Sequence, residues 1–503
     1  MDNRKLIFTL IAAVVALIAS PAWASYAIYV GKNLTSDGSV FIGGTGDEPS
    51  SHWLEIVPRK NHTASETISV GVTKEANYPG ELIEIPQVPV TAKYITMNYS
   101  EYLGFPAPLT NGGLNEYGVA ARDVWSPSRQ DLAKMTPNPQ HGPNYSDLSR
   151  IAMERAHTAR EAVEIVGQLI DKYGYSTYGG NSHMFADSQE GWVLIDFAGG
   201  KGLWIAERLG PNDIRMSYPG YILEIPLDFQ KHPEKYRGSS NFISFAVEQG
   251  WYDPGSGKPF NVNDVYQEGK GRSESVKIFE ERLRQKASAA KISLRDFLDT
   301  IRDPLASADW NGYGQVAHLR QAVSRSDLNV LWVAATGSVT TPFVPYWIGV
   351  DHVRPEFGKH RYLSHKESER FLYRDFEIQE ASRFAYVTFK RLMYYTCDKP
   401  SKFLPEVTEA LQAFEDQSIS QTATVEAKAA KLFSIGEAEM ARDSLTNYSS
   451  QRAMDALDLG DALLGSIEAR HRLLYGYRAP VGTEMSGYGH PPAVSVHCRD
   501  RQE

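Results

Sequence analysis

The pattern of hydrophobic and polar positions divides the chain near residue 360. Before that point, short runs rich in β-branched and aromatic residues alternate with turns rich in Gly and Pro, a pattern typical of strands. Residues 26–30 (YAIYV) and 40–42 (VFI) lie on either side of a Ser-Asp-Gly-Ser turn and predict a hairpin. Because residues 26–30 carry almost no polar side chain, we expect a strand that is buried on both faces.

Helices and further strands are predicted in the same part of the chain. A capping box at residues 158–161 (TARE) begins a helix that places Val163, Val166 and Ile170 on one apolar face. Loops rich in Gly and Pro are expected to dominate residues 75–146. The remaining predictions are a strand hairpin at residues 184–186 and 192–197, helices at 273–286 and 293–302, and a buried strand at 330–335.

The second part of the chain has a different character. It contains few glycines, and its pattern predicts helices over residues 366–395, 405–414 and 422–474. We therefore predict one α+β domain over residues 25–360 and a helical C-terminal extension over residues 361–503.

The first 24 residues read as a signal peptide. Two basic residues precede an apolar run over residues 6–19, and Ala22 and Ala24 supply the small residues that a signal peptidase recognises. The alternative is a membrane anchor, but the run is shorter than the ~20 residues that span a bilayer comfortably. We expect an exported protein, periplasmic or extracellular, with no stable membrane insertion after the signal peptide is removed.

Composition narrows the choice of partners. The formal net charge of -9 argues against a nucleic-acid-binding protein, which needs clustered Lys and Arg.

The two cysteines, Cys397 and Cys498, either form one disulfide that ties down the C-terminal tail or remain separate. The sequence leaves open whether the chain forms a homo-oligomer.

Removal of residues 1–24 would place Ser25 at the N-terminus. A terminal α-amine has a pKa near ~8, so part of it is neutral at neutral pH and can accept the proton of an attacking hydroxyl. The alternative is that Ser25 is simply the first residue of an exported protein. Neither an H-E-x-x-H zinc motif nor a G-x-S-x-G nucleophile elbow occurs in the sequence.

Several segments, taken in order, carry a likeness to a known family: residues 25–32 (SYAIYVGK), 36–39 (SDGS), 114–120 (LNEYGVA), 181–187 (NSHMFAD) with the Trp-bearing 192–200, and 341–346 (TPFVPY). Together they resemble peptidase family C69, the secernin-related dipeptidases with an N-terminal nucleophile. Ser25 stands where that family has its catalytic cysteine, so the chain resembles a variant with serine in place of cysteine.

The resemblance implies a fold and a mechanism. The fold would be the four-layer αββα sandwich of N-terminal-nucleophile hydrolases, an α+β architecture, with a helical C-terminal addition. Ser25 would attack an amide carbonyl, its own α-amine would move the proton, and Asn115 and Asn181 would hold the oxyanion. Asp47 would bind the substrate, a dipeptide or short peptide, and no metal or organic cofactor is implied. A non-peptide amide acylase and an exported non-catalytic binding protein are the alternatives.

Some positions depart from the family pattern or have a second interpretation. The family places an arginine where this chain has Gly44, and that arginine would help to orient the nucleophile or the substrate. Asn115 and Asn181 each lie close to glycines and fit equally well as turn residues. Asp47 could instead cap a loop. Serine is also a weaker nucleophile than cysteine, because a hydroxyl is not ionised near neutral pH.

Overall fold

The computed structural model describes residues 25–477, apart from 48–51, 101–103, 219, 221, 268–270, 308–310, 322 and 361–381, together with residues 496, 498 and 499. The predicted signal peptide, residues 1–24, lies outside the described residues. So does residue 361, at which the sequence predicted the start of the extension.

The first large sheet has six antiparallel strands and contains the predicted N-terminal hairpin. All five residues of its second strand, β1, have 0% exposed surface, which confirms the prediction of a strand buried on both faces. In sheet order the strands are β14 (Ile214–Ser217), β1 (Tyr26–Val30), β2 (Val40–Asp47), β18 (Asn311–Leu319), β19 (Val330–Ala334) and β20 (Val344–Trp347).

The second large sheet has eight antiparallel strands. Several of them lie within residues 75–146, where the sequence predicted mainly loops, so that prediction was wrong. In sheet order the strands are β16 (Tyr236–Gly238), β13 (Trp204–Leu209), β12 (Gly191–Asp196), β11 (Asn181–Ala186), β10 (Ala120–Trp125), β9 (Leu109–Asn115), β8 (Tyr94–Tyr99) and β3 (His52–Val57). Three two-stranded pairs complete the described strands: β4 (Lys60–Asn61) with β7 (Val90–Thr91), β5 (Thr67–Val70) with β6 (Ile83–Pro86), and β15 (Glu224–Ile225) with β17 (Phe260–Asn261).

The two large sheets pack face to face. Gly191 in β12 allows the ring of Tyr29 in β1 to approach closely, since a Cβ at Gly191 would lie 2.5 Å from Cε2 of Tyr29. The hydroxyls of Ser182 in β11 and Ser217 in β14 also meet across the interface, at 3.5 Å.

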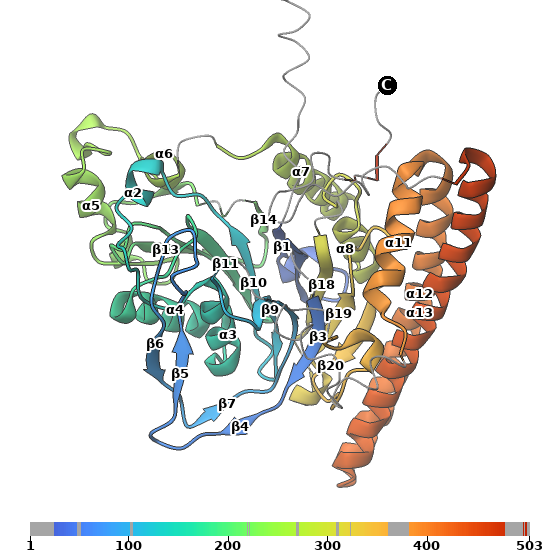
Figure 1. Ribbon diagram of the computed structural model, residues 1–503. Helices are drawn as coiled ribbons and strands as arrows, with labels where there is room; N and C mark the ends of the chain where they lie inside the picture. Colours follow the sequence, from blue (N-terminus) through green and yellow to red (C-terminus); the bar gives the residue numbers. More distant parts are fainter. Residues whose placement is uncertain are drawn as a thin grey trace, which may run out of the picture.

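Helices cover both outer faces of this pair of sheets (Figure 1). Helices α3 (Tyr145–Arg155) and α4 (Ala159–Tyr173) contact the eight-stranded sheet, while α7 (Glu274–Ala289) and α8 (Leu294–Ile301) contact the six-stranded one. The layers therefore follow the order αββα, as predicted. Within the described ranges, three short α-helices lie in the loops: α2 (Gln130–Ala133), α5 (Phe242–Glu248) and α6 (Val262–Tyr266).

Sequence patterns explain where α4 begins and which face it buries. The hydroxyl of Thr158 accepts a hydrogen bond from the backbone N–H of Glu161, which is one half of the predicted capping box. The Glu161 carboxylate accepts from the backbone N–H of His157 instead of Thr158, so the second half is absent. Val163, Val166 and Ile170 are buried against the sheet, at no more than 1% exposure.

The C-terminal extension consists of α11 (Ala385–Asp398), α12 (Pro400–Ser434) and α13 (Ala438–Tyr475), coloured orange to red in Figure 1. The sequence predicted a break between residues 414 and 422 and a continuous helix over 422–474. The structure instead continues α12 through that region and turns at Gly436, whose φ of 89° is a left-handed conformation that favours glycine.

The extension is firmly attached to the sandwich. Helices α12 and α13 contact β20, and Glu415 of α12 accepts hydrogen bonds from Arg295 and Arg302 around α8 and from the backbone N–H of Phe343. A disulfide joins Cys397 in α11 to Cys498, which selects one of the two states that the sequence left open. Among the described residues, no helix combines the length and apolar character needed to cross a bilayer.

Candidate active site

Ser25 lies directly before β1 and is 7% exposed. Side chains of β1 alternate between its two faces. Tyr26 points toward α8, where its hydroxyl donates to the carbonyl of Ile301 at 2.7 Å, whereas Tyr29 points toward the facing sheet. When this alternation is continued back by one residue, Ser25 shares the face of Ala27 and Tyr29, so it faces the space between the two sheets.

The strand next to β1 presents almost no side chains to this space. Ala27 pairs with Gly44 of β2, and Tyr26 pairs with Thr45, so Gly46 lies at the level of Ser25. A Cβ at Gly44 would lie 1.9 Å from the carbonyl oxygen of Tyr26. The backbone here therefore has no room for the arginine that the family pattern places at position 44.

Arg122 enters the same space from β10 of the facing sheet. It is 2% exposed, and its Nη1 donates to the Tyr313 hydroxyl at 3.0 Å and to Gln315 Oε1 at 2.9 Å, both in β18. Its Nε and Nη2 have no hydrogen-bond partner among the described residues. Arg122 is not among the residues predicted from the sequence. The signal available was an Arg-Asp pair inside the apolar run of residues 119–125 (VAARDVW).

Asp123, the neighbour of Arg122, points the opposite way into a buried polar network beside α3. There His183 Nε2 lies 3.2 Å from Asp196 Oδ2, and His183 Nδ1 lies 3.2 Å from the Ser149 hydroxyl. Burial raises the pKa of Asp123 to about 6. The serine, histidine and aspartate have the residue types of a catalytic triad, but each is at most 1% exposed, so no substrate carbonyl reaches Ser149.

Asn181 belongs to this same network. Its Oδ1 accepts a hydrogen bond from the Tyr178 hydroxyl at 2.9 Å, and its Nδ2 lies 3.5 Å from Asp123 Oδ2. Its neighbour Ser182 points toward the six-stranded sheet, where it meets Ser217, so Asn181 lies on the face covered by helices. The structure therefore does not bring Asn181 onto the face that Ser25 shares.

Asn115 ends β9 and organises the turn that follows it. Its Nδ2 donates to the carbonyls of Met153 and Ala156, and its Oδ1 accepts from the backbone N–H groups of Tyr117 and Val119, at 2.8–3.0 Å. These four bonds use both donors and both acceptor positions of the amide. They favour the turn role that the sequence left open over the oxyanion role.

We expect Asn115→Ala to lower stability and to spare activity. Each buried backbone group left without a partner costs about 1–3 kcal/mol, so the free energy of unfolding should fall by at least about 2 kcal/mol. Urea unfolding measures this loss, and kcat/KM of the folded variant should stay within about threefold of wild type. Asn33→Ala, which removes an exposed asparagine bonded to Asn212, is the control. A stable Asn115→Ala protein without turnover would restore the oxyanion role.

Asp47 is the last residue of β2 and pairs through its backbone with Asn311 of β18. Since Thr45 pairs with Tyr26, Asp47 lies at the same end of the sheet as Ser25. Its side chain is outside the described part of the structure, so its role in substrate binding stays a prediction.

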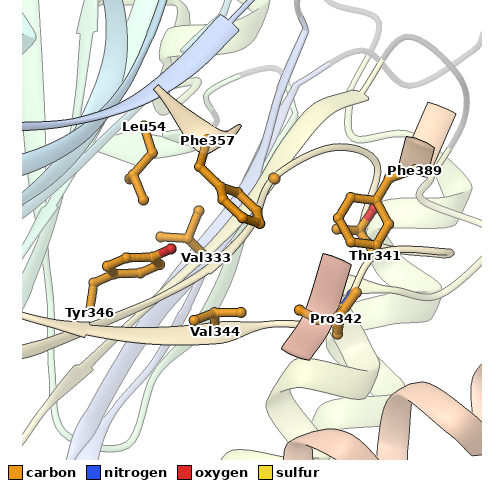
Figure 2. A pocket seen from close by; sticks show the side chains of 10 residues that line it. Leu54, Val333, Thr341, Pro342, Val344, Tyr346, Phe357 and Phe389 are labelled. Carbon is orange, nitrogen blue, oxygen red and sulfur yellow. The ribbon is translucent and has the colours of Figure 1, made fainter. Parts of the chain in front are cut away.

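A separate small cavity lies between β19, β20 and α11 (Figure 2). Its volume of about 10 Å³ has room for about one water molecule. Apart from Thr341 and the hydroxyl of Tyr346, its labelled lining side chains are apolar, among them Val333, Val344 and Phe389 (Figure 2). It is too small for a substrate.

Comparisons with known proteins identify a family and several relatives. The model of peptidase family C69 matches residues 24–277. A probable dipeptidase B of Streptococcus pyogenes serotype M3 is 25% identical over 208 residues, which are 40% of this chain and 38% of the relative. The serotype M1 protein of the same name is 26% identical over 206 residues, again 40% and 38%. The matched region thus spans well under half of these relatives.

Solved structures with a more distant likeness are two mutants of conjugated bile acid hydrolase from Clostridium perfringens. One is 10% identical with a TM-score of 0.30, covering 64% of this chain and 92% of the hydrolase. The other is 9% identical with a TM-score of 0.31, covering 65% and 93%. Because these scores are low, the fold assignment rests on the four layers described above.

Proposed function

The chain belongs to peptidase family C69, and on that basis we propose that it is an exported hydrolase of dipeptides or short peptides with Ser25 as its N-terminal nucleophile. The observation that carries the proposal is the position of Ser25 directly before a strand buried on both faces. A nucleophile attached to such a strand is held in one orientation, which is what a preorganised catalytic group requires.

In the proposed reaction, the Ser25 hydroxyl attacks the carbonyl carbon of the scissile amide, and the α-amine of Ser25 takes the proton. That proton passes to the leaving nitrogen as the C–N bond breaks, which leaves an acyl ester on Ser25. Water then attacks the ester carbonyl and gives one proton to the α-amine. The amine passes that proton to the Ser25 oxygen as the acyl–oxygen bond breaks, which restores the hydroxyl and releases the acid. We assign the substrate's amino group to Asp47 and leave Asn115 and Asn181 out of the mechanism.

Two alternatives predict different substrates. A non-peptide amide acylase would cleave simple acyl amides and not dipeptides. An exported binding protein on this scaffold would bind peptides without cleaving them. A panel that contains both classes of amide therefore separates the three proposals.

The mature protein is expected to begin at Ser25. Mass spectrometry of the exported protein tests this directly, and a start at any other residue would remove the mechanism.

A matched activity test compares protein that begins at Ser25 with protein that carries one additional alanine ahead of it. The extra residue turns the amine into an amide and displaces the base, so turnover should fall by roughly 100-fold or more. Equal turnover by the two forms would show that the α-amine is not the base.

A further inference from the structure

The guanidinium of Arg122 is buried without a matching negative charge. It is 2% exposed, and no carboxylate among the described residues forms a salt bridge with it. Its two bonded partners, Tyr313 and Gln315, are neutral. A buried cation that lacks a partner is costly to a folded protein, because it has lost its hydration without a compensating charge. Such a group indicates a site that an anion completes.

The unoccupied part of Arg122 has the geometry for a carboxylate. Nη1 is used by Tyr313 and Gln315, whereas Nε and Nη2 have no acceptor among the described residues. The N–H groups on Nε and Nη2 lie side by side on one edge of the planar guanidinium. Two parallel donors of this kind bind the two oxygens of one carboxylate, an arrangement that a lysine cannot reproduce.

The strand register sets the separation between the partners of Arg122 and the nucleophile. Gly314, between the two partners of Arg122, pairs with Thr45 of β2, which pairs with Tyr26 of β1. Two strand spacings amount to ~10 Å. In a dipeptide the scissile carbonyl carbon lies ~4 Å from the C-terminal carboxylate carbon. The attack distance of the hydroxyl and the charge-assisted hydrogen bond to the guanidinium add ~3 Å each, so a dipeptide attacked by Ser25 can reach Arg122 with its C-terminus. The intervening positions on β2 are Gly44 and Gly46, so no side chain of β2 separates Ser25 from Arg122.

We infer that Arg122 binds the free C-terminal carboxylate of the substrate and thereby restricts the enzyme to dipeptides and similarly short acids. This inference rests on the proposed function. It also accounts for Gly44: the cation that the family pattern places on β2 is supplied here by β10 of the facing sheet, and the space left by the glycines holds the substrate.

The test compares one dipeptide with its C-terminal amide, which has the same scissile bond and no carboxylate. Wild type should prefer the dipeptide by roughly 100-fold in kcat/KM. Arg122→Gln should lose this preference, with a fall of roughly 100-fold on the dipeptide, mainly in KM, and little change on the amide. Arg122→Lys, which keeps the charge without the paired donors, should fall between the two.

Arg129→Gln is the matched control. Arg129 donates to the carbonyl of Val265 and lies over the ring of Trp251. Neither partner belongs to a strand of the two large sheets, so the loss of Arg129 should not change the preference. If Arg122 only joins the two sheets, Arg122→Gln will reduce both substrates equally and lower the melting temperature. That outcome would overturn the inference.

A failure of the proposed function is distinguishable from a failure of this inference. If wild type cleaves neither substrate, the hydrolase proposal fails, and calorimetry with the same dipeptide then tests Arg122 by itself. Binding that weakens at least tenfold in Arg122→Gln supports the carboxylate site. Equal binding by the two proteins, or no binding by wild type, overturns it.

Discussion

Ser25→Ala is expected to lower the turnover of a dipeptide by about 10⁴-fold or more, since the residue that forms the acyl intermediate is gone. The fold should remain intact. Ser25 precedes β1 rather than belonging to it, and the substitution removes one hydroxyl from the end of a strand whose own five residues stay buried. Steady-state kinetics measures the loss, and circular dichroism with thermal unfolding checks the fold. Wild-type turnover by Ser25→Ala would exclude the N-terminal-nucleophile mechanism.

Ser25→Cys is the informative companion variant. It keeps a nucleophile in the same place and restores the residue that the family pattern has there. We expect it to retain turnover, because a thiol is partly ionised near neutral pH and a hydroxyl is not. A variant as inactive as Ser25→Ala would mean that the site around residue 25 has adapted to the smaller oxygen. The comparison thus separates loss of the nucleophile from disturbance of its surroundings.

The N-terminal hairpin could be predicted because its local and its tertiary requirements agree. Residues 26–30 are apolar on both faces of the strand, and the Asp-Gly turn after them has the residues that a tight turn needs. Residues 109–115 (LTNGGLN) lie in the region that was predicted to consist mainly of loops, but they form strand β9. Their glycines suggest a loop, yet a Cβ at Gly113 would lie 2.0 Å from the carbonyl oxygen of Ile95 in the next strand. The glycines of β9 serve close strand packing, which sequence alone does not reveal.

The candidate site was predictable only in part, for a similar reason. Proximity to Gly118 and resemblance drew attention to Asn115, but its role depends on carbonyls of residues 153 and 156, about forty positions away in the sequence. Which face of β11 carries Asn181 depends on the register with β10 and β12. A shift of this register by one residue would move every side chain of β11 to the opposite face of the sheet. Arg122 becomes a candidate only when β10 and β18 are seen to face each other.

Glu415→Ala is expected to give the largest loss of stability. The Glu415 side chain is 0% exposed, and it accepts hydrogen bonds from the guanidinium groups of Arg295 and Arg302 and from the backbone N–H of Phe343. Without it, the buried Arg302 keeps only the more distant Asp299, at 3.6 Å, whereas Arg295 still has Asp416. Removing one member of a buried ion pair costs about 3–5 kcal/mol, and urea unfolding should show a loss of that size.

The control and the functional consequence follow from the same contacts. Glu439→Ala, on an exposed face of α13, should change stability by no more than about 0.5 kcal/mol. Arg302 directly follows Ile301, the residue whose carbonyl holds the Tyr26 hydroxyl, so a loosened α8 also loosens the strand that carries Ser25. Glu415→Ala should therefore lose turnover at temperatures below its own unfolding transition, while Glu439→Ala keeps it. If Glu415→Ala unfolds like wild type, apolar contacts alone hold the extension to the sandwich, and the link from α12 to the nucleophile is absent.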